Sequence, residues 1–341
     1  MQSTPMMPIV SKIKGMSFLA GTRAPMGDCA EEQEEANVTA TITVRVHEAQ
    51  EENLVRSLEA LDAPLKVVRG PTEGAEGPRV LIAFRPPGDE DVTGYDWIHL
   101  AGAGADHMAP ALKGARRLPI VTKTVGAMGR QMAEYCLSYV LADLQLHAKR
   151  ATMQRDHRWS QSEGEPHFLF DRSVAIIGTG AIGSAMATAI APLAKEVIGY
   201  SRSGKPAGGF TRTSPLEAFE AADIAIAALP LAPGTKGVIG ENVLGRMQSG
   251  LFINVGRGAT VDEIALRSAL ARGAVRKAVL DVFAEEPLPE DHWAWEHPDV
   301  VVTSHVSGVT REEDTLAAFR DKLPGFLDGT LRSDIDIERG Y

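Results

Sequence analysis

The side chains of Arg257, Glu286 and His305 are suited together to the reduction of a carbonyl group. Each comes just after a short apolar run that is typical of a buried strand; the runs are residues 251–255, 279–283 and 300–303. Addition of hydride to a carbonyl group requires a proton donor for the oxygen and a cation that polarises the substrate. Histidine can donate a proton near neutral pH, and arginine can hold a carboxylate through two parallel hydrogen bonds. A carboxylate on the other imidazole nitrogen would orient the ring and favour its protonated form.

Each of these residues alone also has a plain structural interpretation. Arg257 could be a solvated charge or part of an ion pair, Glu286 a surface acid before a proline, and His305 a buried structural histidine. Taken together they favour function, because the carboxyl ends of parallel strands meet at one edge of a sheet, where ligands bind. We therefore predict Arg257, Glu286 and His305 to be catalytic.

A glycine-rich turn stands between an apolar run and a helical pattern. The turn is Gly178-Thr179-Gly180-Ala181-Ile182-Gly183, and it follows residues 174–177. Its first glycine permits a tight turn, the second lets backbone approach a pyrophosphate, and the third lets the helix pack on the strand. The helix N-terminus offers N–H groups to phosphates. This context favours dinucleotide binding over a plain glycine turn.

The sequence after the next strand indicates which dinucleotide binds. An NAD site usually places an acid there, about twenty residues after the glycines, for the ribose hydroxyl. This chain has Ser201-Arg202-Ser203-Gly204-Lys205, which contains no carboxylate. Hydroxyl and cationic groups suit a 2′-phosphate. We therefore predict a cofactor site at Ser201, Arg202 and Ser203 that prefers NADP(H) over NAD(H), the alternative being a solvated basic loop.

Length and composition place the chain among soluble globular proteins of two domains. It has 341 residues, of which 44% are hydrophobic, and 35 basic against 45 acidic side chains give a net charge of −10. This balance predicts no nucleic-acid or membrane partner. Cys29 and Cys136 lie far apart, which predicts no metal site and favours a reducing, cytoplasmic location. Residues 1–38 are expected to be a flexible extension, with organelle targeting as the alternative.

Apolar runs alternate with helical patterns along the rest of the chain, which predicts α/β architecture with parallel sheets. A long helix is expected from Met128 to about Arg155. Thr260 and Glu263 are expected to form a capping box for a helix over 261–271 that ends at Gly273. Strands are expected at 38–46, 65–68, 80–84, 97–100, 224–229, 251–255, 279–282 and 300–303, with a further helix at about 51–61.

Three longer motifs resemble those of the D-isomer specific 2-hydroxyacid dehydrogenase family. They are Asn254-Val255-Gly256-Arg257-Gly258-Ala259-Thr260-Val261-Asp262-Glu263, Leu280-Asp281-Val282-Phe283-Ala284-Glu285-Glu286-Pro287-Leu288-Pro289, and Thr303-Ser304-His305-Val306-Ser307-Gly308. The resemblance runs from about residue 40 to the C-terminus. Ser201-Arg202-Ser203 and the ending Arg339-Gly340-Tyr341 are most similar to NADPH-dependent glyoxylate/hydroxypyruvate reductases of the bacterial A type. Ser304 departs from the proline usual before the histidine, and residues 1–38 have no counterpart.

The resemblance implies a role for each matching residue. Arg257 would bind a 2-oxo acid, His305 would protonate its carbonyl oxygen, and Glu286 would support His305. Backbone N–H groups of Ala103 and Gly104 would receive the substrate carboxylate, and Arg85 is a weaker candidate for substrate binding. Asp281 would bond the nicotinamide carboxamide. Other cofactor contacts would come from Leu229, Pro230, Val255, Gly256 and Gly308.

The resemblance also implies the domain plan: two Rossmann-like, doubly wound parallel-sheet domains with an active-site cleft between them. Residues 39–125 and 308–341 would form a flavodoxin-like substrate domain, and residues 126–307 the NAD(P)-binding domain. A homodimer is expected, with the helix at 128–155 as a contributor. The expected activity is NADPH-dependent reduction of a small 2-oxo acid, glyoxylate or hydroxypyruvate, to the D-2-hydroxy acid. The alternatives are a dehydrogenase for larger 2-oxo acids and a non-enzymatic NADP(H)-sensing protein resembling a corepressor.

Overall fold

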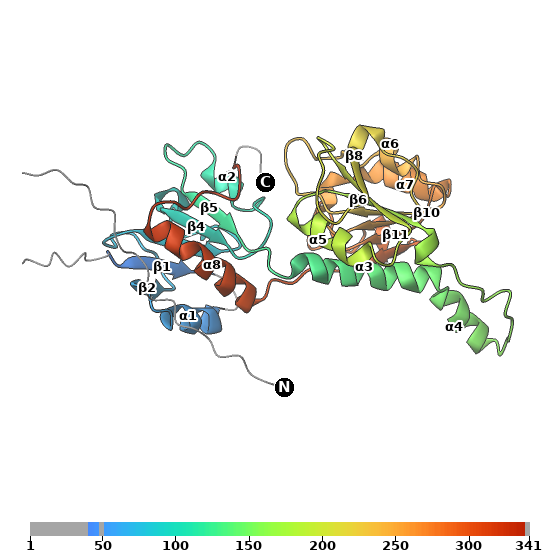
Figure 1. The fold of residues 1–341 in the computed structure, drawn as a ribbon, viewed down its shortest axis with the longest axis horizontal. Helices are drawn as coiled ribbons and strands as arrows, with labels where there is room; N and C mark the ends of the chain where they lie inside the picture. Colours follow the sequence, from blue (N-terminus) through green and yellow to red (C-terminus); the bar gives the residue numbers. More distant parts are fainter. Residues whose placement is uncertain (1–39, 48–50, 338–341) are drawn as a thin grey trace, which may run out of the picture. The chain divides into compact units, whose positions relative to one another are not determined.

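The computed structural model describes residues 40–47 and 51–337 of the chain. In this part of the chain the strands form two separate sheets, and every strand pair in both sheets is parallel (Figure 1). This arrangement confirms the predicted α/β class with two parallel sheets. The predicted extension at residues 1–38 and the ending 339–341 lie outside the described residues.

The first sheet has five strands in the order β2-β1-β3-β4-β5. Helices α1 (Glu51–Glu59) and α8 (Glu312–Leu327) share a hydrophobic core with one of its faces, and Phe319 of α8 is fully buried there. The other face packs against α2 (Ala109–Leu112) and Ile335. The C-terminal segment therefore contributes to both faces of this sheet. The strands are β1 (Ile42–Val46), β2 (Leu65–Val68), β3 (Arg79–Ala83), β4 (Trp97–Leu100) and β5 (Ile120–Lys123).

The second sheet has seven strands in the order β12-β11-β10-β9-β6-β7-β8. The chain runs outward from β6 to β8, returns to pair β9 with the other side of β6, and then continues outward to β12. The strand order thus reverses beside β6, at a switch point where ligands bind in open α/β sheets. The strands are β6 (Ser173–Ile177), β7 (Glu196–Ser201), β8 (Arg212–Pro215), β9 (Ile224–Ala227), β10 (Gly250–Asn254), β11 (Val275–Leu280) and β12 (Val300–Val302).

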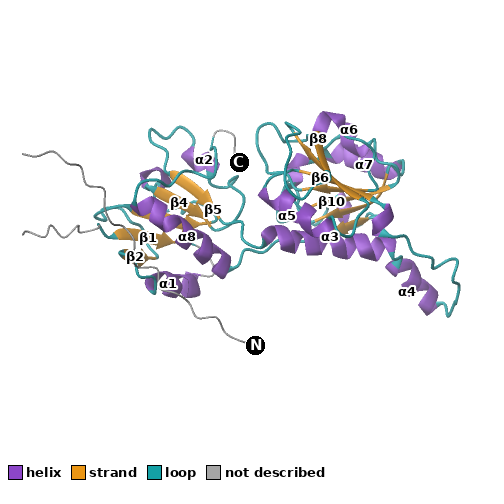
Figure 2. Ribbon diagram, viewed as in Figure 1, coloured by secondary structure: helices purple, strands orange, loops and turns teal. Residues whose placement is uncertain are grey.

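Helices cover both faces of the second sheet (Figure 2). On one face α3 (Met128–Leu144) and α5 (Ala181–Ile190) pack over a core that includes Cys136, Met186 and Ile253. On the other face α6 (Glu241–Leu244) and α7 (Glu263–Ala271) pack over Phe252 and neighbouring apolar residues. Burial on both faces explains why the central strands are continuous apolar runs.

The long helix predicted from Met128 to Arg155 is wrong, because the structure divides it into α3 and α4 (His147–Arg155). Leu146, between them, has a left-handed backbone conformation with φ 54°. The carbonyl oxygen of Leu144 accepts a hydrogen bond from the N–H of His167, at 2.9 Å. A contact with a segment about twenty residues away thus takes a carbonyl group that a continuing helix would use.

The predicted capping box at Thr260 and Glu263 is also wrong. Asp262 caps α7, and its side chain accepts a hydrogen bond from the N–H of Ala265 at 3.1 Å. The Thr260 hydroxyl donates instead to the carbonyl oxygen of Arg257. The helix end was predicted correctly, because Gly273 follows α7 with φ 75°.

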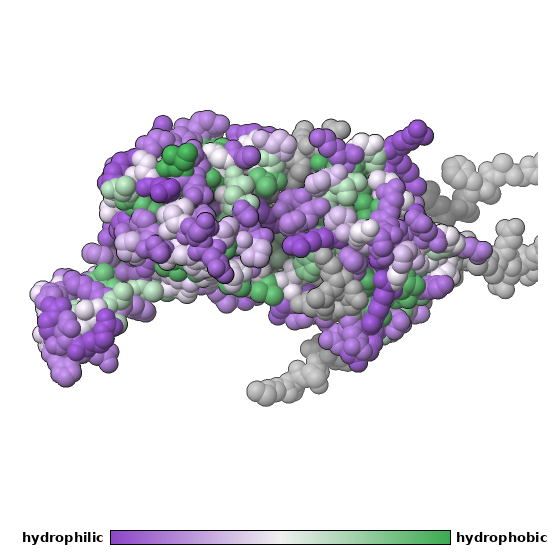
Figure 3. All heavy atoms as spheres, turned by 180° about the vertical axis from the view of Figure 1, so that it is seen from behind, coloured by the Kyte–Doolittle hydropathy of each residue, from purple (hydrophilic) through white to green (hydrophobic). Residues whose placement is uncertain are grey.

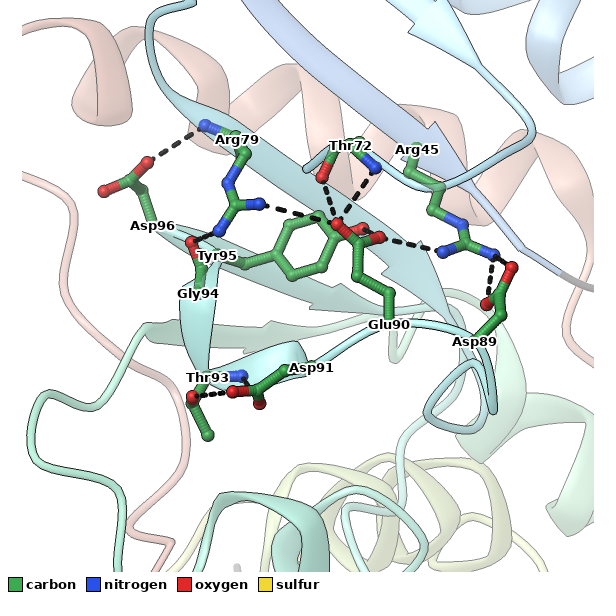
Figure 4. A network of polar contacts seen from close by, with 10 residues as sticks. All are labelled: Arg45, Thr72, Arg79, Asp89, Glu90, Asp91, Thr93, Gly94, Tyr95 and Asp96. Atoms are coloured by element: carbon green, nitrogen blue, oxygen red, sulfur yellow. Dashed lines mark hydrogen bonds and ion pairs between the residues drawn. The ribbon is translucent and has the colours of Figure 1, made fainter. Parts of the chain in front are cut away.

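A buried polar network covers part of the first sheet (Figure 4). Arg45 of β1 donates to Glu90 and to Asp89, both at 2.8 Å, although the Glu90 side chain is completely buried. Glu90 also accepts from the N–H and the hydroxyl of Thr72, and from the hydroxyl of Tyr95. Burial tends to raise the pKa of Glu90, but these hydrogen bonds outweigh it and keep the pKa below its usual range. The network holds the segment between β3 and β4 against β1.

Hydrophilic residues cover most of the face drawn in Figure 3, with hydrophobic residues scattered between them. No helix among the described residues is long and apolar enough to span a membrane.

Candidate active site

The strands bring the three predicted catalytic residues to one edge of the second sheet. Arg257 follows β10, Glu286 follows β11 and His305 follows β12. These strands are neighbours and parallel, so their carboxyl ends lie at the same edge. Their turns also pack closely, since a side chain at Gly258 would lie 1.9 Å from the backbone of Phe283.

His305 and Glu286 form a hydrogen-bonded pair. The distance from His305 Nδ1 to Glu286 Oε2 is 2.8 Å, and the side chains are 41% and 37% exposed. The second oxygen of Glu286 accepts from the N–H of Phe283 at 2.9 Å, which fixes the carboxylate. An ionised carboxylate can only accept, so Nδ1 carries the hydrogen in this pair. Nε2 is therefore the ring nitrogen available for proton transfer to a substrate.

The backbone at His305 adopts a left-handed conformation, with φ 57°. Such a conformation costs of order 1 kcal/mol or more for a non-glycine residue, and it persists only where surrounding contacts hold it. Here Asp281 supplies the contacts. Its carbonyl oxygen accepts from the N–H of His305 at 2.8 Å, and its carboxylate accepts from the N–H groups of Val306 and Ser307, both at 2.9 Å.

Asp281 is 1% exposed, and its carboxylate also accepts from the Thr303 hydroxyl. Burial tends to raise its pKa, but the hydrogen bonds from Ser307, Thr303 and Val306 outweigh burial and lower the pKa. The aspartate is therefore ionised and anchors the loop that carries His305. The family resemblance implies a contact between Asp281 and the nicotinamide but does not predict this anchoring role, although the acid stands at a strand end. The carboxamide contact stays a prediction.

Arg257 makes a two-pronged ion pair with Asp106, a residue that the sequence analysis did not identify. Arg257 Nε and Nη2 each lie 3.1 Å from a different carboxylate oxygen of Asp106, and Nη1 donates to the Gly256 carbonyl at 2.9 Å. The signal that could have identified Asp106 is an acid within the same loop as Ala103 and Gly104.

The loop predicted to receive the substrate carboxylate lies beside Arg257. A side chain at Gly104 would come within 2.0 Å of Arg257 Nη2, so the guanidinium would have to move to accommodate it. Ala103 packs against the core of the second sheet that contains Val255. Arg85 is exposed in the loop after β3, and within the described residues no hydrogen bond joins it to Arg257. Its role stays a prediction.

The glycine turn after β6 has the shape that a dinucleotide requires. Gly178 has φ 118°, and a side chain there would lie 2.6 Å from the carbonyl oxygen of Ala228. A side chain at Gly183 would lie 1.8 Å from the carbonyl oxygen of Gly178. Gly180, at the N-cap of α5, has no such neighbour within 4 Å. The first and third glycines thus serve close packing, whereas the second leaves room for a phosphate.

Other predicted cofactor residues line the same edge. A side chain at Gly256 would lie 2.6 Å from the carbonyl oxygen of Leu229, so these two backbones touch. Pro230 is exposed. Val255 is only 1% exposed, so its side chain is buried, and a ligand could contact this residue only through its backbone. A side chain at Gly308 would collide with Met128 of α3, which gives that glycine a packing role. Thr179, Ala181 and Ile182 lie within the glycine turn and the start of α5.

The basic loop after β7 is folded on itself. The Ser201 hydroxyl accepts from the N–H of Gly204 at 3.1 Å, and the Ser203 hydroxyl accepts from the N–H of Lys205 at 3.4 Å. Arg202 is exposed, and in the part of the chain that the structure describes its guanidinium has no ion-pair partner. The residues at this position thus include a cation that could bind a phosphate.

Comparison with known proteins gives consistent results. Residues 137–307 match the family model described as D-isomer specific 2-hydroxyacid dehydrogenase, NAD binding domain. A glyoxylate/hydroxypyruvate reductase A of Yersinia enterocolitica is 33% identical over 289 residues, which cover 80% of this chain and 90% of that protein.

Solved structures of the same family share the fold. A D-isomer specific 2-hydroxyacid dehydrogenase from Xanthobacter autotrophicus Py2, in complex with NADPH and MES, superposes with a TM-score of 0.74 at 26% identity, covering 87% of this chain and 99% of that chain. A probable 2-hydroxyacid dehydrogenase from Rhizobium etli CFN 42, in complex with NADP, HEPES and L(+)-tartaric acid, superposes with a TM-score of 0.73 at 25% identity. The superposition covers 88% of this chain and 99% of that chain. The chain therefore belongs to the D-isomer specific 2-hydroxyacid dehydrogenase family and is an oxidoreductase.

Proposed function

We propose that this enzyme reduces a small 2-oxo acid, such as glyoxylate or hydroxypyruvate, to the D-2-hydroxy acid with NADPH. The observation that carries the proposal is the 2.8 Å pair between His305 Nδ1 and Glu286, at the same sheet edge as Arg257 and the glycine turn. The name of the Yersinia relative supports the substrate class, since that protein is a glyoxylate/hydroxypyruvate reductase.

A bound reduced nicotinamide would supply the hydride that adds to the carbonyl carbon. His305 Nε2 donates a proton to the carbonyl oxygen, which completes the hydroxyl group of the product. Glu286 keeps the imidazole ring oriented for this transfer through Nδ1. Arg257 binds the carboxylate of the substrate and polarises the adjacent carbonyl group, together with the N–H groups of Ala103 and Gly104.

NADP(H) is preferred over NAD(H) in this proposal. Arg202, with Ser201 and Ser203, would bind the 2′-phosphate through charge-assisted hydrogen bonds. The loop contains no acid to bond a ribose hydroxyl in its place. The Xanthobacter and Rhizobium relatives, which were solved with NADPH and NADP, support this preference.

We further propose the domain division of residues 39–125 with 308–341 against 126–307. Burial of Phe319 and Ile335 in the two cores of the first sheet supports the return of the C-terminal segment to the first domain. Because NADPH is supplied inside cells, the proposed activity assigns the enzyme to the cytoplasm.

The test is a panel of 2-oxo acids, including glyoxylate, hydroxypyruvate and larger aryl or branched acids, assayed with NADPH and with NADH. The expected result is the highest kcat/KM for a two- or three-carbon acid with NADPH. Higher kcat/KM for the larger acids would contradict the substrate class. Absence of turnover with every acid would contradict the enzymatic proposal and favour a sensing role.

A further inference from the structure

Asp106 uses only one side of the Arg257 guanidinium. Its two carboxylate oxygens bond Nε and Nη2, which lie along the same edge of the planar group. Arginine has five N–H donors in a fixed plane: one on Nε and two on each terminal nitrogen. Asp106 takes two of them, and the carbonyl oxygen of Gly256 takes one from Nη1.

The two remaining hydrogens are one on Nη1 and one on Nη2. The hydrogen left on Nη2 lies along the end of the guanidinium, because Asp106 takes the other one along the Nε edge, and Nη1 shares that end. A carboxylate can bind this second edge with two parallel bonds. Among the described residues no further hydrogen bond of Arg257 uses this edge. The close approach of Gly104 to Nη2 places the backbone of the loop 103–104 beside the same nitrogen.

The pair is partly shielded from water. The side chains of Arg257 and Asp106 are 25% and 17% exposed, and the ring of His107 lies 3.9 Å from Asp106. Burial tends to raise the pKa of Asp106, but the hydrogen bond and charge of Arg257 outweigh it and lower the pKa. Asp106 is therefore a fixed negative charge. Without it, the one hydrogen bond left to the Arg257 side chain among the described residues would be that to the Gly256 carbonyl.

We propose that Asp106 is a positioning residue that grips Arg257 along the Nε–Nη2 edge and thereby presents the Nη1–Nη2 edge to the carboxylate of the 2-oxo acid. This inference rests on the proposed function. It differs from a competitive arrangement, in which Asp106 would occupy the same edge as the substrate and would have to be displaced. In the positioning arrangement both carboxylates bind one guanidinium at the same time.

The experiment compares Asp106→Asn with the unaltered enzyme on two carbonyl substrates, glyoxylate and glycolaldehyde. Glycolaldehyde is a small aldehyde without a carboxylate, so it does not need the presented edge. Asn keeps the size of the side chain but has neither the negative charge nor the second acceptor oxygen that the two-pronged pair uses. We expect kcat/KM for glyoxylate to fall by about 10- to 100-fold, mainly through KM, and kcat/KM for glycolaldehyde to change little. The control variant is Asp62→Asn, which makes the same substitution at an exposed acid in the segment after α1 and should leave both values of kcat/KM unchanged.

A second variant keeps the inference testable if Asp106→Asn folds poorly. In Arg257→Lys the ammonium has no second edge to present, so adding Asp106→Asn to that background should cost little further activity. An unchanged or lower KM of Asp106→Asn for glyoxylate would overturn the inference, and so would an equal loss on both substrates. These outcomes differ from failure of the proposed function, in which the unaltered enzyme reduces no 2-oxo acid.

Discussion

Glu286 divides its two oxygens between the backbone N–H of Phe283 and the ring of His305. Glutamine has an acceptor oxygen and a donor NH2 group, so Glu286→Gln cannot accept through two oxygens from both the Phe283 N–H and the His305 Nδ1–H. We expect kcat to fall by about 10²- to 10⁴-fold, as when the orienting carboxylate of a catalytic histidine is replaced. Steady-state kinetics with glyoxylate measure this, and Glu285→Gln, a neighbouring exposed acid, is the matched control. Equal kinetics of the two variants would remove Glu286 from the mechanism.

Arg202 is the residue on which the proposed cofactor preference depends most. Each charge-assisted hydrogen bond to a phosphate contributes about 1.5–3 kcal/mol. Arg202→Ala should therefore raise KM for NADPH by about 10- to 100-fold and change KM for NADH little. Initial rates with each cofactor measure the difference, and Arg332→Ala removes the same charge at another exposed position as a control. An equal effect on both cofactors would show that Arg202 does not bind the 2′-phosphate.

At the scale of residues, the sequence predicted the placement of Arg257, Glu286 and His305 because each follows a strand. Parallel strands then bring such positions to one edge. Asp106 could not be predicted in the same way, since its partner lies 151 residues away. Its role depends on how a loop of one sheet meets a turn of the other, which no local pattern encodes.

At the scale of elements, β4 and β5 are joined through a buried histidine. His99 is fully buried, its Nδ1 lies 2.8 Å from the Thr122 hydroxyl, and its Nε2 lies 3.1 Å from the Thr124 hydroxyl. Burial, aided by the positive charge of Lys322, lowers the pKa of His99 from 6.5 to about 3. The native protein thus keeps this ring neutral at pH values where the unfolded chain takes up a proton.

This difference makes the free energy of unfolding sensitive to acid. Between pH 6.5 and about 3 the unfolded state binds one more proton at His99, so stability falls as the pH falls. The slope from this residue is about 1.4 kcal/mol per pH unit. His99→Gln should flatten the acid branch of urea-unfolding free energies by about that amount, whereas His107→Gln, at an exposed histidine, should not. Parallel acid branches for the two variants and the unaltered protein would contradict this assignment.

Helix boundaries were predicted correctly where a residue at the boundary determines it, and were missed where a contact with another part of the structure determines it. Gly273 ends α7 as predicted, because glycine readily adopts the left-handed conformation found there. Leu146 breaks the helix with no glycine or proline beside it, and the contact between His167 and Leu144 that accompanies the break comes from a distant loop. Asp262 caps α7 in place of Thr260, since Thr260 already bonds Arg257.

At the scale of the whole molecule, the segment after α4 exposes large apolar side chains. Trp159 is 100% exposed, and Phe168 and Phe170 are 44% and 63% exposed and stacked on each other. A second copy of the chain that packs on α3 and this segment would cover them, as the predicted homodimer requires. The combined substitution of Trp159 and Phe170 by serine should shift sedimentation equilibrium toward monomer. Ile264→Ser, at an apolar residue that is 82% exposed on α7, should leave the assembly unchanged. A monomeric unaltered protein would contradict the dimer.

The central claim is that His305 donates the proton in a reduction by NADPH. The most direct measurement is the rate of NADPH oxidation with saturating glyoxylate, for the unaltered enzyme and for His305→Asn. We predict a loss of about 10²- to 10⁴-fold in kcat, with little change in KM for NADPH. An equal kcat for the two proteins would contradict the claim.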